Sequence, residues 1–203
     1  QLKLECAQKQ IADALFAPLV IKYDINQLFA NFQVIGHGSF GDVYCAEIIS
    51  KSYHLSLYTY GEHVAIKKIS LKQPLKDLKK EVCILADCQH DNIVQYKETY
   101  IWADHLWVVM GYCNGGTLEQ LRESNVLSED IISIICLDIL SGLSYLHGKK
   151  HKVHRDIKPE NIFLHMNGSI KIGDLGFSMD ISYETRHKRN SIAGTARYLA
   201  PEM

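Results

Sequence analysis

The stretch from Phe32 to Glu47, which reads FQVIGHGSFGDVYCAE, constrains the fold of this chain most strongly. Its apolar residues alternate with polar ones and are interrupted by glycines, so the stretch predicts a β-hairpin with a glycine-rich tip. The glycines are Gly36, Gly38 and Gly41. Glycine lets backbone amides approach phosphate oxygens that a side chain would keep away. A dinucleotide-binding fold would continue into a helix after this pattern. Here Val43 and Tyr44 resume a strand, which argues against that fold.

A lysine and a glutamate downstream of the hairpin are candidates for one ion pair. Residues 64–69 read VAIKKI and predict a strand with Lys67 at its centre. Pro74 is expected to open a helix, and Glu81 lies on the apolar stripe of that helix. A carboxylate on an inward face needs a cation, and Lys67 paired with it would bind nucleotide phosphates. The alternatives are an edge-strand lysine kept for solubility and an ordinary surface glutamate.

Residues 154–161, which read HRDIKPEN, place an acid, two cations and an amide in one tight loop. Phosphoryl transfer from a nucleotide needs a carboxylate for the hydroxyl proton, a cation near the phosphate and an amide oxygen for the metal. Asp156, Lys158 and Asn161 can fill these roles, and Asp174 in a later turn could be a second metal ligand. A solvated charged turn is the alternative interpretation of the loop.

The helix predicted after Ser128 is apolar nearly all round and is expected to end at Gly148. This pattern predicts a buried core helix. By contrast, residues 49–60 are rich in Ser and Tyr and predict an exposed insertion between two strands.

Composition excludes several classes of partner. With 203 residues and 47% hydrophobic content, the chain can bury a substantial core in one or two lobes. A net charge of −1 gives no footprint for nucleic acid, and no run of 18 apolar residues predicts a membrane span. The six cysteines lack CxxC spacing, which favours free thiols and a cytoplasmic location. No signal peptide is recognised at the start of the chain.

The motifs GHGSFGDV, VAIKK, HRDIKPEN, GDLG and LAPE occur in this order, and together they resemble the eukaryotic protein kinases from about Phe32 to the end of the chain. The resemblance implies an α+β, bilobal fold with an antiparallel N-lobe sheet, a helix αC and an incomplete helical C-lobe. It implies a flank over 1–31, an N-lobe over 32–110, a hinge over 111–117 and a partial C-lobe over 118–203. Kinase domains usually continue beyond the APE motif, so a chain of this extent is expected to expose apolar surface and to be marginal in stability, and an inactive fragment remains an alternative.

The resemblance also assigns roles to residues. Lys67 and Glu81 would form the activating pair, with Asp156 as catalytic base and Lys158 on the γ-phosphate of ATP. Asn161 and Asp174 would bind Mg²⁺. The ATP-binding set would be Gly36, Gly38, Gly41, Val43, Ala65, Lys67, Met110, Gly111, Cys113 and Phe163. A stack of Leu85, Tyr96, His154 and Leu175 would form the apolar spine of the active state.

The position of Lys158, two residues after Asp156, resembles the Ser/Thr class, and several stretches are similar to the PAK branch of the STE group. Those stretches are LWVVMGYCNGGTL, NGSIKIGDLGFS and KRNSIAGT. Protein substrates would carry serine or threonine, and Glu160 favours a basic residue near the acceptor. Regulation by a small GTPase would require regions outside this chain.

Three residues near the catalytic loop are expected to regulate it. By the same resemblance, Ser191 would be the activating phosphoacceptor, Arg155 would bind its phosphate, and Thr195 would brace Asp156. A pseudokinase or nucleotide-binding scaffold is the competing function. Such proteins usually lose one of the lysine and aspartates that correspond to Lys67, Asp156 and Asp174, and none is lost here.

Overall fold

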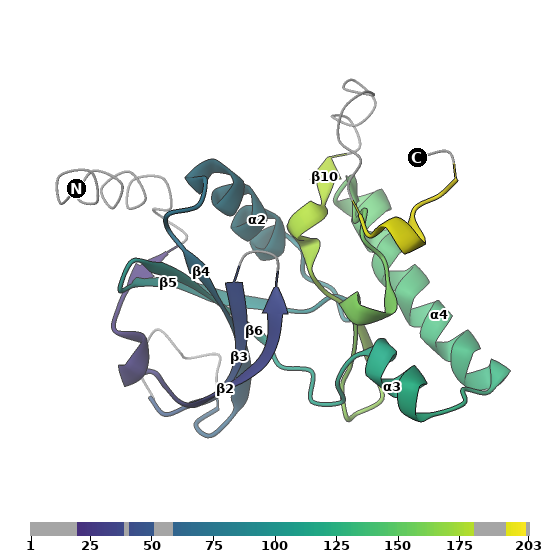
Figure 1. Ribbon diagram of the computed structural model, residues 1–203, viewed down its shortest axis with the longest axis horizontal. Helices are drawn as coiled ribbons and strands as arrows, with labels where there is room; N and C mark the ends of the chain where they lie inside the picture. Colours follow the sequence, from purple (N-terminus) through teal and green to yellow (C-terminus); the bar gives the residue numbers. More distant parts are fainter. Residues whose placement is uncertain (1–19, 39–40, 51–58, 181–193, 202–203) are drawn as a thin grey trace. The chain divides into compact units, whose positions relative to one another are not determined.

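The computed structural model describes residues 20–38, 41–50, 59–180 and 194–201, which form two compact units (Figure 1). The first unit runs to Ala86 and includes Tyr96–Tyr112. The second contains Asp87–Gln95 and the chain from Cys113 onward. The first unit is built on a large sheet and the second contains most of the helices, which agrees with the predicted α+β class.

The first unit is built on a six-stranded sheet in the order β1-β5-β6-β4-β3-β2. Its strands are β1 (Ile21–Lys22), β2 (Phe29–Gly38), β3 (Gly41–Ile48), β4 (His63–Ser70), β5 (Tyr96–Trp102) and β6 (His105–Gly111). All pairings are antiparallel except the short one between β1 and β5. The antiparallel sheet predicted from the sequence is therefore confirmed. The end of the predicted flank also enters the sheet, because it contributes β1 and the start of β2.

One face of this sheet carries the unit's core. Alternate residues of β3 and β4, among them Ala46, Ile48, Val64 and Ile66, are fully buried on it. The 3-10 turn η1 (Ile25–Gln27) adds the buried Ile25 to the same cluster. The opposite face is left for the other alternate residues of β3 and β4, which include Lys67.

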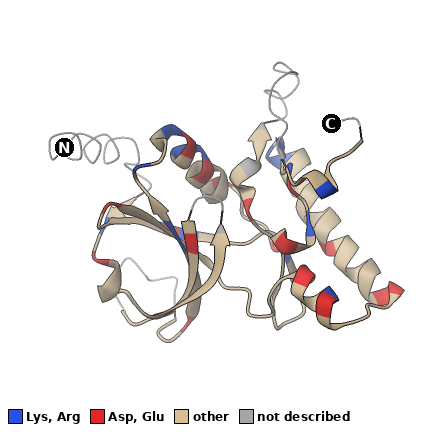
Figure 2. Cartoon of the chain, viewed as in Figure 1, with Lys and Arg blue, Asp and Glu red and all other residues tan. Residues whose placement is uncertain are grey.

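Helix α2 (Leu75–Asp87) follows β4 and confirms the helix predicted after Pro74. Its buried residues fall on one stripe, at Leu78, Glu81, Val82, Ile84 and Leu85. Outside this stripe the helix carries three lysines and two aspartates, Lys76, Lys79, Lys80, Asp77 and Asp87 (Figure 2). The helix is thus amphipathic in the usual sense, with a single carboxylate on its apolar stripe.

The second unit contains two helices and two small sheets. The helices are α3 (Leu118–Ser124) and α4 (Glu129–Ser144), and the π-helical turn η3 (Tyr145–Lys149) follows α4 directly. Strands β7 (Lys152–Val153) and β10 (Met179–Asp180) form one sheet, and β8 (Ile162–Leu164) and β9 (Ile170–Ile172) form the other. The 3-10 turns are η4 (Pro159–Asn161), η5 (Leu175–Phe177) and η6 (Ala196–Tyr198). Ser128 caps α4 as predicted, because its side chain accepts a hydrogen bond from the Ile131 amide.

The expectation that α4 is a buried core helix is wrong. Only Ile135 and Gly142 of this helix are buried, while Ile134, Leu137 and Leu140 are 59%, 65% and 61% exposed. The helix is apolar on more than one side, and within the described part of the chain the β8–β9 hairpin covers only the side that carries Ile135. Apolar side chains of this helix are therefore exposed among the described residues.

The segment Glu129–Lys149 is long and apolar enough to cross a membrane by length and composition alone, which is weak evidence. Its contacts place it within the second unit instead. The Asp138 carboxylate accepts the Ile170 amide at 3.1 Å. A Cβ atom added at Gly142 would approach the Asn92 carbonyl oxygen to 2.9 Å, so α4 lies in close contact with the chain around Asn92.

Candidate active site

Lys67 and Glu81 form a buried ion pair in the first unit. The Lys67 ammonium lies 2.6 Å from Glu81 Oε1, and the two side chains are only 9% and 7% exposed. Strand β4 presents the lysine on the face opposite the core, and the apolar stripe of α2 presents the glutamate. Removing either charge would leave the other buried without its partner, which is costly. The two alternatives of a solvated surface lysine or glutamate are excluded.

The residues predicted to contact adenine from this unit lie on the same face of the sheet as Lys67. Val43 is the cross-strand partner of Lys67, and Ala65 is the partner of Met110. Ala65 is also two residues from Lys67 on β4, so all these side chains share one face. Gly111, the next residue after Met110, ends β6 opposite Val64.

The hairpin formed by β2 and β3 closes at the pair Gly38 and Gly41, and residues 39 and 40 lie outside the described residues. Gly41 has a φ of +153°, and a Cβ atom there would lie 1.9 Å from the Lys68 carbonyl oxygen. Gly36 differs, because a Cβ atom there would meet nothing within 4 Å among the described residues. Position 41 therefore requires glycine for the fold, whereas glycine at position 36 leaves open space beside the strand.

In the second unit, Asp156 lies at the centre of a hydrogen-bond network. Its Oδ1 accepts from the backbone amide and from the hydroxyl of Thr195, each at 2.8 Å. Its Oδ2 lies 3.0 Å from Lys158 Nζ and accepts from Asn161 Nδ2 at 3.0 Å. The Lys158 ammonium also donates to the Thr195 hydroxyl at 2.7 Å. Four predicted site residues are therefore in direct contact.

This network keeps Asp156 ionised although the residue is only 4% exposed. Burial alone raises the pKa of its carboxyl group, but hydrogen bonds from Thr195 and Lys158 and the lysine charge outweigh burial, so the pKa lies below its usual range. An ionised carboxylate can accept a proton from a hydroxyl group that approaches it. The alternative of a solvated charged turn is excluded by this burial.

Asn161 and Asp174 have features that suit a hard metal ion. Asn161 uses its amide nitrogen to donate to the Asp156 carbonyl and carboxylate, so its amide oxygen remains available for a cation. Asp174 is half-buried and left-handed at φ +54° and ψ +66°, an uncommon conformation for a residue other than glycine. No group of three or more His, Cys, Asp or Glu suited to a metal occurs among the described residues. Mg²⁺ commonly uses one or two carboxylates together with phosphate oxygens, so this donor set fits it.

His154 makes two hydrogen bonds that the sequence did not predict. The resemblance to kinases assigned this residue only to an apolar stack. Its Nδ1 accepts the Asp156 amide at 3.2 Å, so its Nε2 carries the proton and donates to the Gly173 carbonyl at 2.8 Å. Burial lowers the pKa of the imidazole, which is only 2% exposed. A neutral histidine thus connects the backbone of Asp156 to the segment that leads into Asp174. Its position two residues before Asp156 was the one available signal.

The remaining predicted residues are placed in part. Arg155 is half-buried with φ +73°, and its Nη1 lies 3.7 Å from the Met179 sulfur. Ser191 lies outside the described residues. Phe163 lies on β8 and bridges to Thr117, and Cys113 is buried with the pKa of its thiol raised by burial.

Comparisons with known proteins agree with this geometry. The family model described as the protein kinase domain matches residues 29–203. The chain is 41% identical over 198 residues to the serine/threonine-protein kinase dst1 of Dictyostelium discoideum, covering 96% of this chain and 25% of that protein. It is 38% identical over 185 residues to the serine/threonine-protein kinase pakA of the same organism, covering 89% and 14%. It is 39% identical over 182 residues to the serine/threonine-protein kinase ste20 of Aspergillus oryzae, covering 89% and 20%. The chain thus spans about a quarter or less of the length of these relatives.

Proposed function

The chain belongs to the protein kinase domain family, and we propose that it carries the catalytic machinery of a serine/threonine kinase that uses ATP and Mg²⁺. The observation that supports this most directly is the buried, ionised Asp156 in contact with Lys158, Asn161 and Thr195. The pseudokinase alternative is less favoured because Lys67, Asp156 and Asp174 are all present. The similarity to pakA and ste20 matches the PAK branch that the sequence motifs indicated.

In the proposed reaction, Asp156 orients the acceptor hydroxyl of a protein serine or threonine and accepts its proton. Thr195 and Asn161 donate to the carboxylate and fix its position. Lys158 carries a positive charge 3.0 Å from the carboxylate and is proposed to stabilise the negative charge of the transferring phosphoryl group.

Nucleotide binding is proposed to use the face of the first unit's sheet that carries Lys67. The Lys67 ammonium, oriented by Glu81, would contact phosphate oxygens, and Val43, Ala65 and Met110 would contact adenine. By the resemblance to protein kinases, Cys113 and Phe163 also belong to the proposed ATP-binding set. Asn161 and Asp174 would bind Mg²⁺, which neutralises phosphate charge when it is bound.

Substrate choice and regulation are proposed from the same residues. Glu160 is an exposed residue of the catalytic loop 154–161, which favours substrates with a basic residue near the acceptor. Phosphorylation of Ser191 is proposed to activate the enzyme through Arg155. A cytoplasmic location is proposed from the free cysteines among the described residues.

The test is transfer of the γ-phosphate of ATP to an arginine-containing serine peptide. It should be measured on the 203-residue chain and on a chain extended beyond Met203, each beside its Asp156→Asn variant. We expect the extended chain to transfer phosphate and the variant to lose transfer by at least two orders of magnitude. Equal transfer by the two would refute the proposed base. Tight binding of Mg-ATP without transfer would favour the scaffold function.

A further inference from the structure

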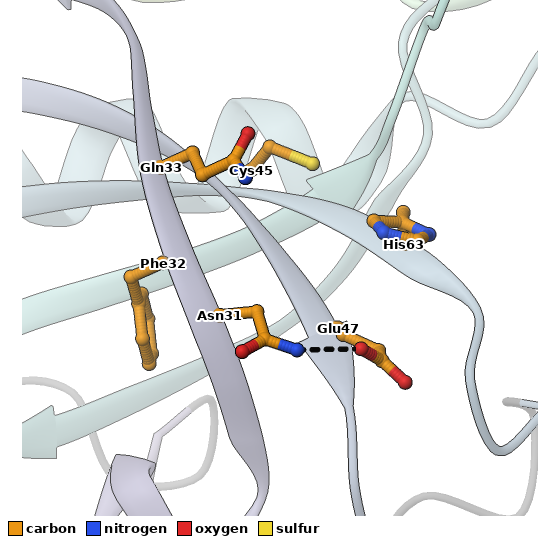
Figure 3. A pocket seen from close by; sticks show the side chains of 6 residues that line it. All are labelled: Asn31, Phe32, Gln33, Cys45, Glu47 and His63. Atoms are coloured by element: carbon orange, nitrogen blue, oxygen red, sulfur yellow. Dashed lines mark hydrogen bonds between the residues drawn. The ribbon is translucent and has the colours of Figure 1, made fainter.

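A cavity of about 350 Å³ opens on strands β2, β3 and β4 of the first unit (Figure 3). Most of the side chains that line it are polar. The lining residues are Asn31, Phe32, Gln33, Cys45, Glu47 and His63. None of them takes part in the function proposed above, although four of them lie in the hairpin stretch Phe32–Glu47.

Strand register places this cavity on the sheet face that carries Lys67. The cross-strand pairs of β3 and β4 run without interruption from Val43–Lys67 through Cys45–Ala65 to Glu47–His63. Cross-strand partners share a face, and so do alternate residues of one strand. The pair Glu47–His63 therefore continues the proposed adenine surface in the direction away from Lys67.

Strand geometry also gives the spacing along this face. Ala65 and His63 are two positions apart on β4, which corresponds to about 7 Å, and Lys67 and His63 are four positions apart, about 13 Å. A nucleotide with its phosphates at Lys67 and its base against Ala65 would stop short of the cavity. A substituent on the base about 7 Å long would reach it.

The chemistry of the cavity favours a cation. Glu47 is half-buried, and its Oε2 accepts a hydrogen bond from Asn31 Nδ2 at 2.8 Å (Figure 3). This bond holds the carboxylate in place at the wall of the cavity. Burial raises the pKa of the Cys45 thiol, so the sulfur stays uncharged near neutral pH. No Lys or Arg lines the cavity in the described part of the chain, and His63 is the other titratable group.

Gln33 adds an amide to the same wall, and its carbonyl oxygen is an acceptor. A fixed carboxylate beside a second oxygen acceptor suits a group that carries both a positive charge and several N–H donors. A primary ammonium group has these properties. We propose that this cavity binds the ammonium group of a ligand whose ring occupies the adenine face, with Glu47 as its charged partner. The inference rests on the proposed function, because it assumes that the base lies against Ala65.

The test uses a matched pair of nucleotides. One is ATP with a 6-aminohexylamino chain on carbon 2 of adenine, and the other is its N-acetyl derivative, which has the same chain without the charge. Dissociation constants are measured by titration calorimetry with the chain and with unmodified ATP as reference. We expect the amine to bind about threefold to fivefold more tightly than its acetyl derivative, as for a partly exposed ion pair.

Three variants assign the preference to one carboxylate. Glu47→Gln keeps an acceptor for Asn31 and removes the charge, so the ratio of the two constants should fall to about one. Glu47→Asp keeps a carboxylate and should retain a ratio above that of the glutamine variant. Glu123→Gln makes the same change on the exposed surface of α3 and should leave the ratio unchanged.

Failure of the inference is distinguishable from failure of the proposed function. A chain that binds unmodified ATP but does not distinguish the amine from its acetyl derivative overturns the inference alone. An unchanged ratio in Glu47→Gln also overturns it, because the charge would then play no part. A chain that does not bind ATP or either derivative overturns the proposed function and this inference with it.

Discussion

Thr195 donates both its backbone amide and its hydroxyl to the same oxygen of Asp156, at 2.8 Å each. The two residues are 39 positions apart in the chain, so this contact connects the catalytic loop to the segment before the Ala-Pro-Glu motif. The hydroxyl also accepts from Lys158 at 2.7 Å. One side chain therefore positions both the proposed base and the proposed phosphate-binding cation.

The Thr195→Val variant should lower kcat by about 10-fold to 100-fold, because hydrogen bonds to charged groups contribute about 1.5–3 kcal/mol. Valine has the same shape, but its side chain cannot donate to Asp156 or accept from Lys158, while its backbone amide still donates to Asp156. KM for ATP should stay within about twofold, because the lost hydroxyl contacts Asp156 and Lys158 and not the residues proposed to bind adenine. Thr195→Ser is the control and should retain most activity. Steady-state kinetics on the extended chain measure both constants, and a valine variant with normal kcat would contradict the role of the hydroxyl.

Replacing Lys67 by methionine should destabilise the chain by about 3 kcal/mol, because the Glu81 carboxylate would remain buried without its cation. The double variant Lys67→Met with Glu81→Met should recover much of this loss, since two apolar side chains of similar length can pack in the same space. Nucleotide binding should be lost in both. Urea unfolding and ATP titration separate the two effects. Equal stability of the single and double variants would contradict the cost assigned to an unpaired, buried Glu81 carboxylate.

Much of the first unit could be predicted because its signals are local. The apolar stripe that carries Glu81 and the strand that carries Lys67 are visible within short windows, and their pairing follows from the cost of an unpaired buried charge. The glycine hairpin could be predicted in the same way. Short-range periodicity was therefore sufficient for the elements and for half of the site.

Other features depend on contacts between distant segments, which periodicity does not contain. The exposed side of α4 depends on which segments cover it, and an apolar sequence alone does not reveal that. The hydrogen bond from His154 to the Gly173 carbonyl depends on two loops meeting. The cavity beside Glu47 depends on the left-handed conformation of Asn31, φ +55°, at a register shift in β2. No pattern in the sequence predicted this shift.

The two glycines of the hairpin should respond differently to alanine. Gly41→Ala should lower the free energy of unfolding by about 1–3 kcal/mol, because the new Cβ would overlap the Lys68 carbonyl and the positive φ disfavours a side chain. Gly36→Ala should change it by less than about 1 kcal/mol, since the added methyl group meets open space. Denaturant unfolding of the two variants in parallel tests the contrast. Equal losses would mean that the close approach at position 41 is relieved by movement of the strand.

The stability of the chain should depend on pH through His154. Burial lowers the pKa of this imidazole in the folded chain, whereas in the unfolded chain it takes its ordinary value of about 6.5. Below pH of about 6.5 the unfolded chain therefore binds a proton that the folded chain does not, so stability falls as pH falls through that value. Asp156 acts in the same direction in a lower window, because its pKa is also lowered when folded and its stabilisation is lost only as pH falls below about 3.9.

The measurement is the denaturant midpoint between pH 8 and pH 5 for the chain and for His154→Asn. Asparagine can still accept the Asp156 amide but does not reach the Gly173 carbonyl and does not titrate, so the variant should be less stable at pH 8 and should lose less stability on acidification. His151→Asn is the matched control, because His151 is exposed and its replacement should leave the slope unchanged. If the chain and the His154 variant lose stability in parallel between pH 7 and pH 5, protonation of this buried imidazole is not what destabilises the fold, and one of the other histidines must carry the effect.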